Sequence, residues 1–93
     1  MRVYFYATFR EIVGSKHIDL VLADGITVKQ LLDRVLLEHP GLRPEMLDAA
    51  GALSKHVHIF VNGRGCVFLD RGLDTPVSAS DDRIDFFPAV AGG

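Results

Sequence analysis

The residues of this 93-residue chain that are best suited to binding or chemistry fall into two groups, and the first is aromatic. Four aromatic side chains occupy the outward positions of three alternating segments, namely Tyr4, Tyr6, Phe60 and Phe87. If those segments pair as neighbouring strands, the four side chains form one patch beside His58 and Val21. A contiguous apolar patch is typical of a binding surface, so we predict that this patch binds a partner. Isolated exposed aromatic residues, which are common on monomers, are the alternative.

The second group is the end of the chain, where we expect a flexible tail over residues 89–93. Pro88 is followed by three residues with small or short side chains and by two glycines: Ala89, Val90, Ala91, Gly92 and Gly93. Such a tail can enter a narrow channel in extended form and present its terminal carboxylate inside another protein. On composition alone, a frayed terminus is the simpler interpretation.

The usual catalytic motifs are missing from the sequence. Gly63 and Gly65 begin a GxGxxG pattern, but Phe68 stands where the third glycine is needed, and there is no GxxxxGK[ST] phosphate loop. No nucleophile-elbow motif supports a Ser/His/Asp triad. Cys66 near a histidine could suggest a nucleophile, although a small apolar residue in a short strand is the favoured interpretation.

Metal binding is also disfavoured. His56 and His58 are two positions apart on a predicted strand, which places both imidazoles on one face. A metal site needs at least one further ligand, and Asp85 can supply it only if the strand register brings it close. We therefore favour two solvated histidines and predict no metal site.

Length and composition indicate one independently folding domain. The chain has 48% hydrophobic residues and 24% charged residues, and its formal net charge of −2 gives no indication of a nucleic-acid partner. Its single cysteine cannot form an internal disulfide, and no apolar run approaches the ~20 residues of a membrane span. Because the sequence starts directly in strand-like residues without a signal-peptide pattern, we expect a cytoplasmic protein.

Alternation of apolar and polar residues predicts the strands. Residues 2–7 and 17–22 alternate and are expected to form an antiparallel hairpin around a helical turn at 8–13. Residues 56–61 alternate again and are followed by an Asn62-Gly63 turn and a short returning strand at 65–68. After a loop over 71–80, Asp81-Asp82 leads into a last strand whose pairing ends at Pro88, with Asp85 pointing outward.

One long helix is predicted, from Thr27 to near His39. Thr27 and Gln30 have the spacing of a capping box, and one apolar stripe follows at helical spacing: Val28, Leu31, Leu32, Val35 and Leu36. A short second helix is expected within residues 43–50. This order of elements predicts an α+β domain over residues 1–88, with the helix packed across a mixed sheet. A β-grasp arrangement fits, with the first and last strands as parallel central neighbours.

Three segments resemble the ubiquitin-like sulfur-carrier proteins of the MoaD/ThiS family. Residues 5–14, FYATFREIVG, are similar to the family's first strand and turn, and Val61-Asn62-Gly63 matches its central strand-turn. Residues 85–93, DFFPAVAGG, resemble its diagnostic ending. The resemblance covers nearly the whole chain and implies a β-grasp fold.

The resemblance also implies a chemistry in which this chain is a carrier and not an enzyme. A partner adenylating enzyme uses ATP to activate the carboxylate of Gly93, and a sulfurtransferase or other sulfur donor converts it to a thiocarboxylate. A sulfur-accepting enzyme, such as the large subunit of molybdopterin synthase, then receives the sulfur. Tyr6 and Phe87 match positions that dock partners, and ATP is bound by the partner and not by this chain.

The pathway that receives the sulfur is open at this level. The start of the chain and its FFP segment resemble the small subunit of molybdopterin synthase, which is the favoured interpretation. Residues 42–58 and the PAVAGG ending also resemble carriers for cysteine biosynthesis and small archaeal modifiers, in which the same carboxylate forms an isopeptide bond with a lysine. A ubiquitin-like interaction module whose Gly93 is never activated is the alternative from another class.

Overall fold

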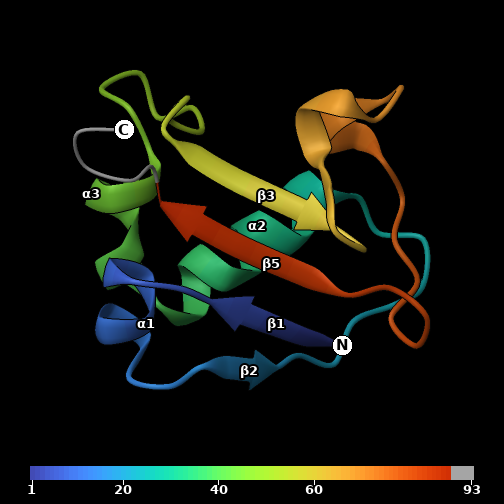
Figure 1. Cartoon of the computed structure of the whole chain (residues 1–93), viewed down its shortest axis with the longest axis horizontal. Helices are drawn as coiled ribbons and strands as arrows, with labels where there is room; N and C mark the ends of the chain where they lie inside the picture. The colour runs from blue at the N-terminus through green and yellow to red at the C-terminus, as the bar shows by residue number, and fades with distance from the viewer. Residues whose placement is uncertain (89–93) are drawn as a thin grey trace.

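The computed structural model describes residues 1–88, which form a mixed sheet with one long helix across one of its faces (Figure 1). The five strands are β1 (Arg2–Phe5), β2 (His17–Asp19), β3 (Val57–Val61), β4 (Arg64–Gly65) and β5 (Ile84–Pro88). Their order in the sheet is β2-β1-β5-β3-β4. The central pair β1–β5 is parallel and the other pairs are antiparallel. The predicted parallel pairing of the first and last strands is therefore confirmed, whereas the predicted tail over 89–93 lies outside the described residues.

Helix α2 (Val28–Glu38) packs against the face of the sheet that is turned away from the viewer in Figure 1. Its start is the capping box expected from the sequence. The Thr27 hydroxyl accepts a hydrogen bond from the Gln30 N–H at 3.1 Å, and the Gln30 side-chain oxygen accepts one from the Thr27 N–H at 2.9 Å. The whole predicted apolar stripe is buried, with exposed fractions of 0–4%. The helix ends at Glu38, with His39 as its C-cap before Pro40.

The core lies between α2 and the inward side chains of the sheet. Phe5 of β1 and Phe86 of β5 are fully buried register partners, and their rings stack at 5.6 Å. Outward-facing residues of the same strands lie on the opposite face, which no helix of residues 1–88 covers (Figure 1). One face of the sheet thus builds the core and leaves the other free to carry a site.

The first hairpin differs from the prediction at Ala7, which the alternation of residues 2–7 placed within the first strand. Strand β1 ends at Phe5, and Ala7 is exposed with φ 53° and ψ −128°. The chain turns there into helix α1 (Thr8–Val13), and Phe9 enters the core in its place. Arg10 Nε donates a hydrogen bond to the Phe5 carbonyl at 3.1 Å, which satisfies the end of the strand.

Other predicted elements are shorter than expected. Strand β2 ends at Asp19, so that residues 20–22 lie outside it. The predicted helix within 43–50 is α3 (Arg43–Met46), preceded by the 3-10 turn η1 (Pro40–Leu42). The predicted strand 65–68 is wrong beyond Gly65, because the chain turns into the 3-10 segment η2 (Cys66–Phe68) and buries Cys66. A further 3-10 turn, η3 (Gly72–Asp74), lies in the predicted loop.

Candidate functional site

Three aromatic side chains meet on the uncovered face of the sheet, as the sequence predicted. The Tyr6 and Phe87 rings stack with centroids 4.0 Å apart and planes 9° from parallel. The Phe60 ring meets Phe87 edge-on at 5.2 Å. All three rings are partly exposed. Phe87 lies on β5, and Phe60 lies on β3, which is one neighbour of β5 in the sheet. Tyr6 directly follows β1, which is the other neighbour, so the order of the strands brings the three rings together. We call Tyr6, Phe60 and Phe87 the aromatic face.

A shallow groove of about 730 Å³ runs along the aromatic face. Its lining residues are Tyr6, His58, Phe60, Gly63, Arg83, Asp85, Phe87 and Pro88. Pro88 is the last described residue, so the chain leaves the described structure at this groove. The groove therefore has an apolar floor, and residues 89–93 continue the chain from a residue that lines it.

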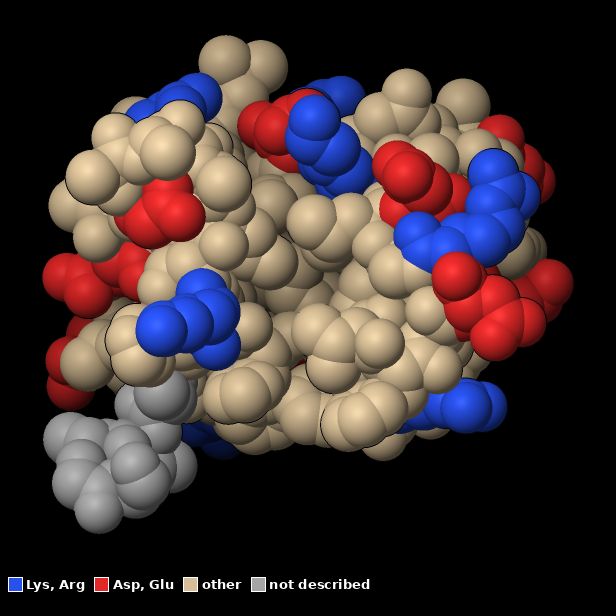
Figure 2. Space-filling view, turned by 90° about the horizontal axis from the view of Figure 1, so that it is seen from above, with Lys and Arg blue, Asp and Glu red and all other residues tan. Residues whose placement is uncertain are grey.

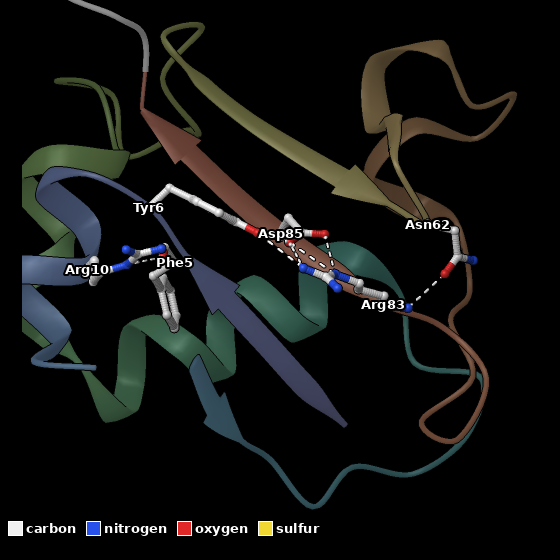
Figure 3. Close-up of polar contacts among 6 residues, drawn as sticks. All are labelled: Phe5, Tyr6, Arg10, Asn62, Arg83 and Asp85. Carbon is white, nitrogen blue, oxygen red and sulfur yellow. Dashed lines mark hydrogen bonds and ion pairs between the residues drawn. The ribbon is translucent and has the colours of Figure 1, made fainter. Parts of the chain in front are cut away.

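One lining residue of the groove, Asp85, carries a buried carboxylate (Figure 3). Asp85 was predicted to point outward, and it does lie on the outward face, yet it is only 6% exposed. Its position on the central strand β5, between the register partners Tyr4 and Phe60, explains this burial. Because an unpaired buried charge is strongly destabilising, the carboxylate must have partners.

Two side chains supply those partners. The Tyr6 hydroxyl donates a hydrogen bond to Asp85 Oδ1 at 2.7 Å. Arg83 Nε lies 3.3 and 3.2 Å from the two carboxylate oxygens, and a terminal guanidinium nitrogen lies 3.2 Å from Oδ1. That same nitrogen donates to the Tyr6 hydroxyl oxygen at 3.2 Å. The three residues form a closed polar network that fixes the Tyr6 ring against Phe87.

The network favours one protonation state for each of its donors. The hydrogen bond to the Asp85 carboxylate, with burial as the next cause, raises the pKa of Tyr6 above its usual value. The hydrogen bonds from Arg83 to Asp85 and then to Tyr6 raise the pKa of the guanidinium. At neutral pH, Tyr6 is therefore a neutral donor and Arg83 a cation.

Tyr4, the fourth predicted aromatic residue, lies on the same face but does not line the groove. The guanidinium carbon of Arg83 sits 3.9 Å from the centroid of its ring, in cation–π geometry. The centroid of the Tyr4 ring also lies 5.6 Å from that of the His17 ring. Val21 is not among the lining residues either, and it lies beyond the end of β2.

Sequence reasoning missed Arg83 entirely, although a signal for it exists. Arg83 and Asp85 are two residues apart, which places them on one face of a strand. The backbone of Arg83 is held by Asn62 in the β3–β4 turn, whose side-chain oxygen accepts from the Arg83 N–H at 2.8 Å. The Asn62 N–H in turn donates to the Arg83 carbonyl at 2.8 Å. The turn residue Asn62 thus positions the cation of the network (Figure 3).

His56 and His58 have different surroundings, and Cys66 is buried. His58 is exposed and lines the groove, whereas His56 lines a separate hollow with Glu45 and Pro88. Within residues 1–88, no cluster of three or more His, Cys, Asp or Glu side chains is arranged to hold a metal ion. Burial raises the pKa of the Cys66 thiol, which disfavours the nucleophilic thiolate.

The fold is a five-stranded mixed sheet crossed by one helix, and the lining of the aromatic groove includes the last described residue, Pro88. These features define a small ubiquitin-like protein. Comparison with protein families agrees: the chain belongs to the ThiS family, whose model matches residues 3–93. The predicted family and its β-grasp fold are thereby confirmed. Among residues 1–88, no helix has both the length and the apolar character required to span a bilayer.

Two relatives show the range of the family. The chain is 38% identical over 93 residues to small archaeal modifier protein 3 of Haloferax volcanii, covering 100% of this chain and 98% of that protein. It is 40% identical over 81 residues to a proposed sulfur carrier protein of Archaeoglobus fulgidus, covering 86% of this chain and 85% of that protein. The chain is thus a small ubiquitin-like carrier or modifier protein and not an enzyme.

Two solved structures have the same fold over almost the entire chain. Small archaeal modifier protein 1 from Methanosarcina acetivorans superposes with a TM-score of 0.84 at 26% identity, covering 99% of this chain and 94% of that one. A chain of the BexX/CysO complex from Amycolatopsis orientalis gives a TM-score of 0.74 at 29% identity, with 99% and 98% covered. That complex shows that a protein of this fold can bind a partner protein.

Proposed function

We propose that the carboxylate of Gly93 is activated by an adenylating enzyme that docks on the aromatic face. The observation that carries this proposal is the position of the groove. Its lining includes Pro88, the end of β5, so a protein bound there lies next to the origin of the remaining chain. Gly93 is five residues further, and five extended residues reach at most about 16–18 Å. An enzyme docked on the groove therefore has its active site within this distance of Pro88.

The proposed chemistry needs no catalytic group on this chain. A carboxylate oxygen of Gly93 attacks the α-phosphorus of ATP bound to the partner, and pyrophosphate leaves. The resulting acyl-adenylate has AMP as a good leaving group, and hydrosulfide supplied by a sulfur donor displaces it, so that the carbon–sulfur bond of the thiocarboxylate forms as the bond to AMP breaks. The small side chains of residues 89–93 permit the close approach that such a step requires.

The fate of the activated terminus separates two candidate functions. In the first, the thiocarboxylate delivers sulfur to an acceptor enzyme, and the start and end of the chain favour molybdopterin synthesis, with carriers for cysteine biosynthesis as the alternative. In the second, the activated carboxylate forms an isopeptide bond with a lysine. The full-length similarity to a small archaeal modifier protein favours this second candidate. Both begin with the same adenylate.

Intact-mass spectrometry tests the shared step. The chain is incubated with the adenylating enzyme of its own genome, ATP and a sulfur donor, and we expect the exchange of one oxygen for one sulfur. A variant lacking Gly93 should remain unmodified, because its carboxylate is set back by about 3.3–3.6 Å. If the enzyme is active and neither adenylate, thiocarboxylate nor lysine conjugate appears, the interaction-module alternative replaces this proposal.

Calorimetric titration with the same enzyme tests the docking surface. Phe87→Asp places a charge in the aromatic face and should weaken binding by about tenfold or more, because aromatic anchors dominate interfaces. Leu37→Asp is the matched control, since Leu37 is 71% exposed on α2, which lies across the other face of the sheet. Circular dichroism establishes that both variants fold. Equal affinities for the two variants would remove Phe87 from the docking surface.

A further inference from the structure

The outer edge of strand β3 is open over part of its length. Strand β4 pairs only with Phe60 and Val61, and among residues 1–88 no strand pairs with the outer edge of Val57–Ile59. Open strand edges present backbone donors and acceptors that can pair with another extended chain. Three residues span about 10 Å, and the Val57 N–H already donates to the Ser54 carbonyl at 3.0 Å, so an added strand can pair with only a few backbone groups here.

An apolar groove of about 500 Å³ follows this open edge. Its floor is β3, one wall is the segment 52–55, and the opposite wall is formed by η2 and η3. The apolar side chains of the lining include Leu53, Val57, Ile59, Cys66, Phe68 and Leu73. Figure 2 shows the molecule from this side, with an uncharged hollow between two lobes whose rims carry charged side chains. Lys55 is the one Lys, Arg, Asp or Glu residue among the lining residues.

The η2 wall exposes apolar surface that the fold does not use. Val67 is 83% exposed and Phe68 is 72% exposed, next to the buried Cys66. The Phe68 ring lies so close to Gly65 that a Cβ at that position would come within 3.2 Å of it. The same added Cβ would lie 3.9 Å from the Phe60 ring. The exposed surface of Val67 and Phe68 therefore adjoins the aromatic face, with Gly65 between them.

We propose that this groove binds a short extended segment of a partner protein as an added strand along β3. The strand floor selects an extended backbone, and the period of two in a strand places alternate side chains of the segment on the apolar walls. Lys55 favours an acidic residue at the end of the segment nearest to it. Because His58 and Phe60 line both grooves, one partner can occupy the aromatic face and this edge together. The inference does not depend on the activation of Gly93.

A peptide titration of the isotopically labelled full chain, followed by NMR, tests the proposal. The probe is acetyl-Glu-Val-Ser-Val-Ser-Val-Glu-amide, which presents a carboxylate to Lys55 in either strand direction. We expect saturable shifts of the amides of β3 and η2, with a Kd of about 1 mM or tighter. A peptide with serine in place of valine should bind at least about tenfold more weakly. Exchanging both Glu residues for Lys should also weaken binding.

Matched variants identify the site. Phe68→Ser should weaken binding of the probe by about tenfold, the fold-change expected when one aromatic contact is lost. Leu37→Ser, with a similar exposed fraction on α2, should bind like the unmodified chain. Absence of binding, shifts confined to the aromatic face, or equal affinity of the two variants would overturn the proposal. Sedimentation velocity showing a dimer that Phe68→Ser dissociates would overturn it too, since a second copy would then fill the groove.

Discussion

Ala7 holds a backbone conformation that strongly favours glycine, which makes Ala7→Gly a sharp test of the turn between β1 and α1. Its φ of 53° and ψ of −128° bring the Cβ close to the backbone. Residues held in such sparsely populated regions are strained by about 1–3 kcal/mol. Glycine has no Cβ, so the substitution removes this strain.

One opposing effect reduces the gain. Glycine increases the conformational entropy of the unfolded chain, which lowers stability by roughly 0.5–1 kcal/mol. The Ala7 side chain is exposed, so no buried contact is lost. The balance is an expected increase of about 1 kcal/mol in the free energy of unfolding.

Urea unfolding followed by circular dichroism measures this difference. For a small domain with a slope of about 1–1.5 kcal/mol per M, the midpoint should rise by roughly 0.7–1 M. Ala50→Gly is the control, because Ala50 is also exposed but has a negative φ. It should lower the midpoint, since only the entropic effect acts. An unchanged or lowered midpoint for Ala7→Gly would refute the strain argument.

Three further substitutions test the core, the helix cap and the polar network. Leu32→Ala should lower the free energy of unfolding by about 2–5 kcal/mol in urea unfolding, because Leu32 is 4% exposed beneath the sheet; a loss below about 0.5 kcal/mol would place it at the surface. Thr27→Ala removes the side-chain half of the capping box and should lower the urea midpoint by an amount equivalent to about 1 kcal/mol. Tyr6→Phe removes the hydrogen bond to Asp85 and should lower the free energy of unfolding by about 1 kcal/mol at pH 7. This loss is smaller than is usual for a hydrogen bond to a fully buried charge, because the Tyr6 ring is partly exposed. Since the folded-state pKa of Tyr6 is raised, this contribution is present below the ordinary tyrosine pKa of about 10 and is lost as the pH rises through the higher folded value. The difference between Tyr6→Phe and the unmodified chain should therefore shrink in unfolding series above about pH 10, and a constant difference would contradict the assignment.

Local signals in the sequence were sufficient for α2 and for the central strands. The capping residues of α2 and its apolar stripe are adjacent along the chain, so their spacing alone predicts both its start and its buried face. The outward positions of Tyr6, Phe60 and Phe87 follow from alternation in the same way. Once β1, β5 and β3 are neighbours, these three side chains have to meet.

The polar network and the end of β4 depend on tertiary contacts that no local pattern encodes. Asp85 was expected to point outward and does, but its burial was not foreseen, because alternation gives the face of a residue and not what its neighbours cover. Asn62, from the β3–β4 turn, holds the backbone of Arg83 just before β5, and the Arg83 side chain bonds to the Asp85 carboxylate. Cys66 was placed in a strand by its apolar neighbours, yet the chain turns there and exposes Val67 and Phe68.

The parallel pairing of β1 with β5 has a consequence for how the chain folds. Val3 pairs with Ile84, so the two central strands come from opposite ends of the sequence. Contacts with such a large sequence separation slow folding, because a long loop must close before they form. During synthesis, β1 and β3 have no shared neighbour until Ile84–Pro88 has left the ribosome. We therefore expect the sheet to be completed, and the aromatic face to assemble, only once Ile84–Pro88 is available to pair with β1 and β3.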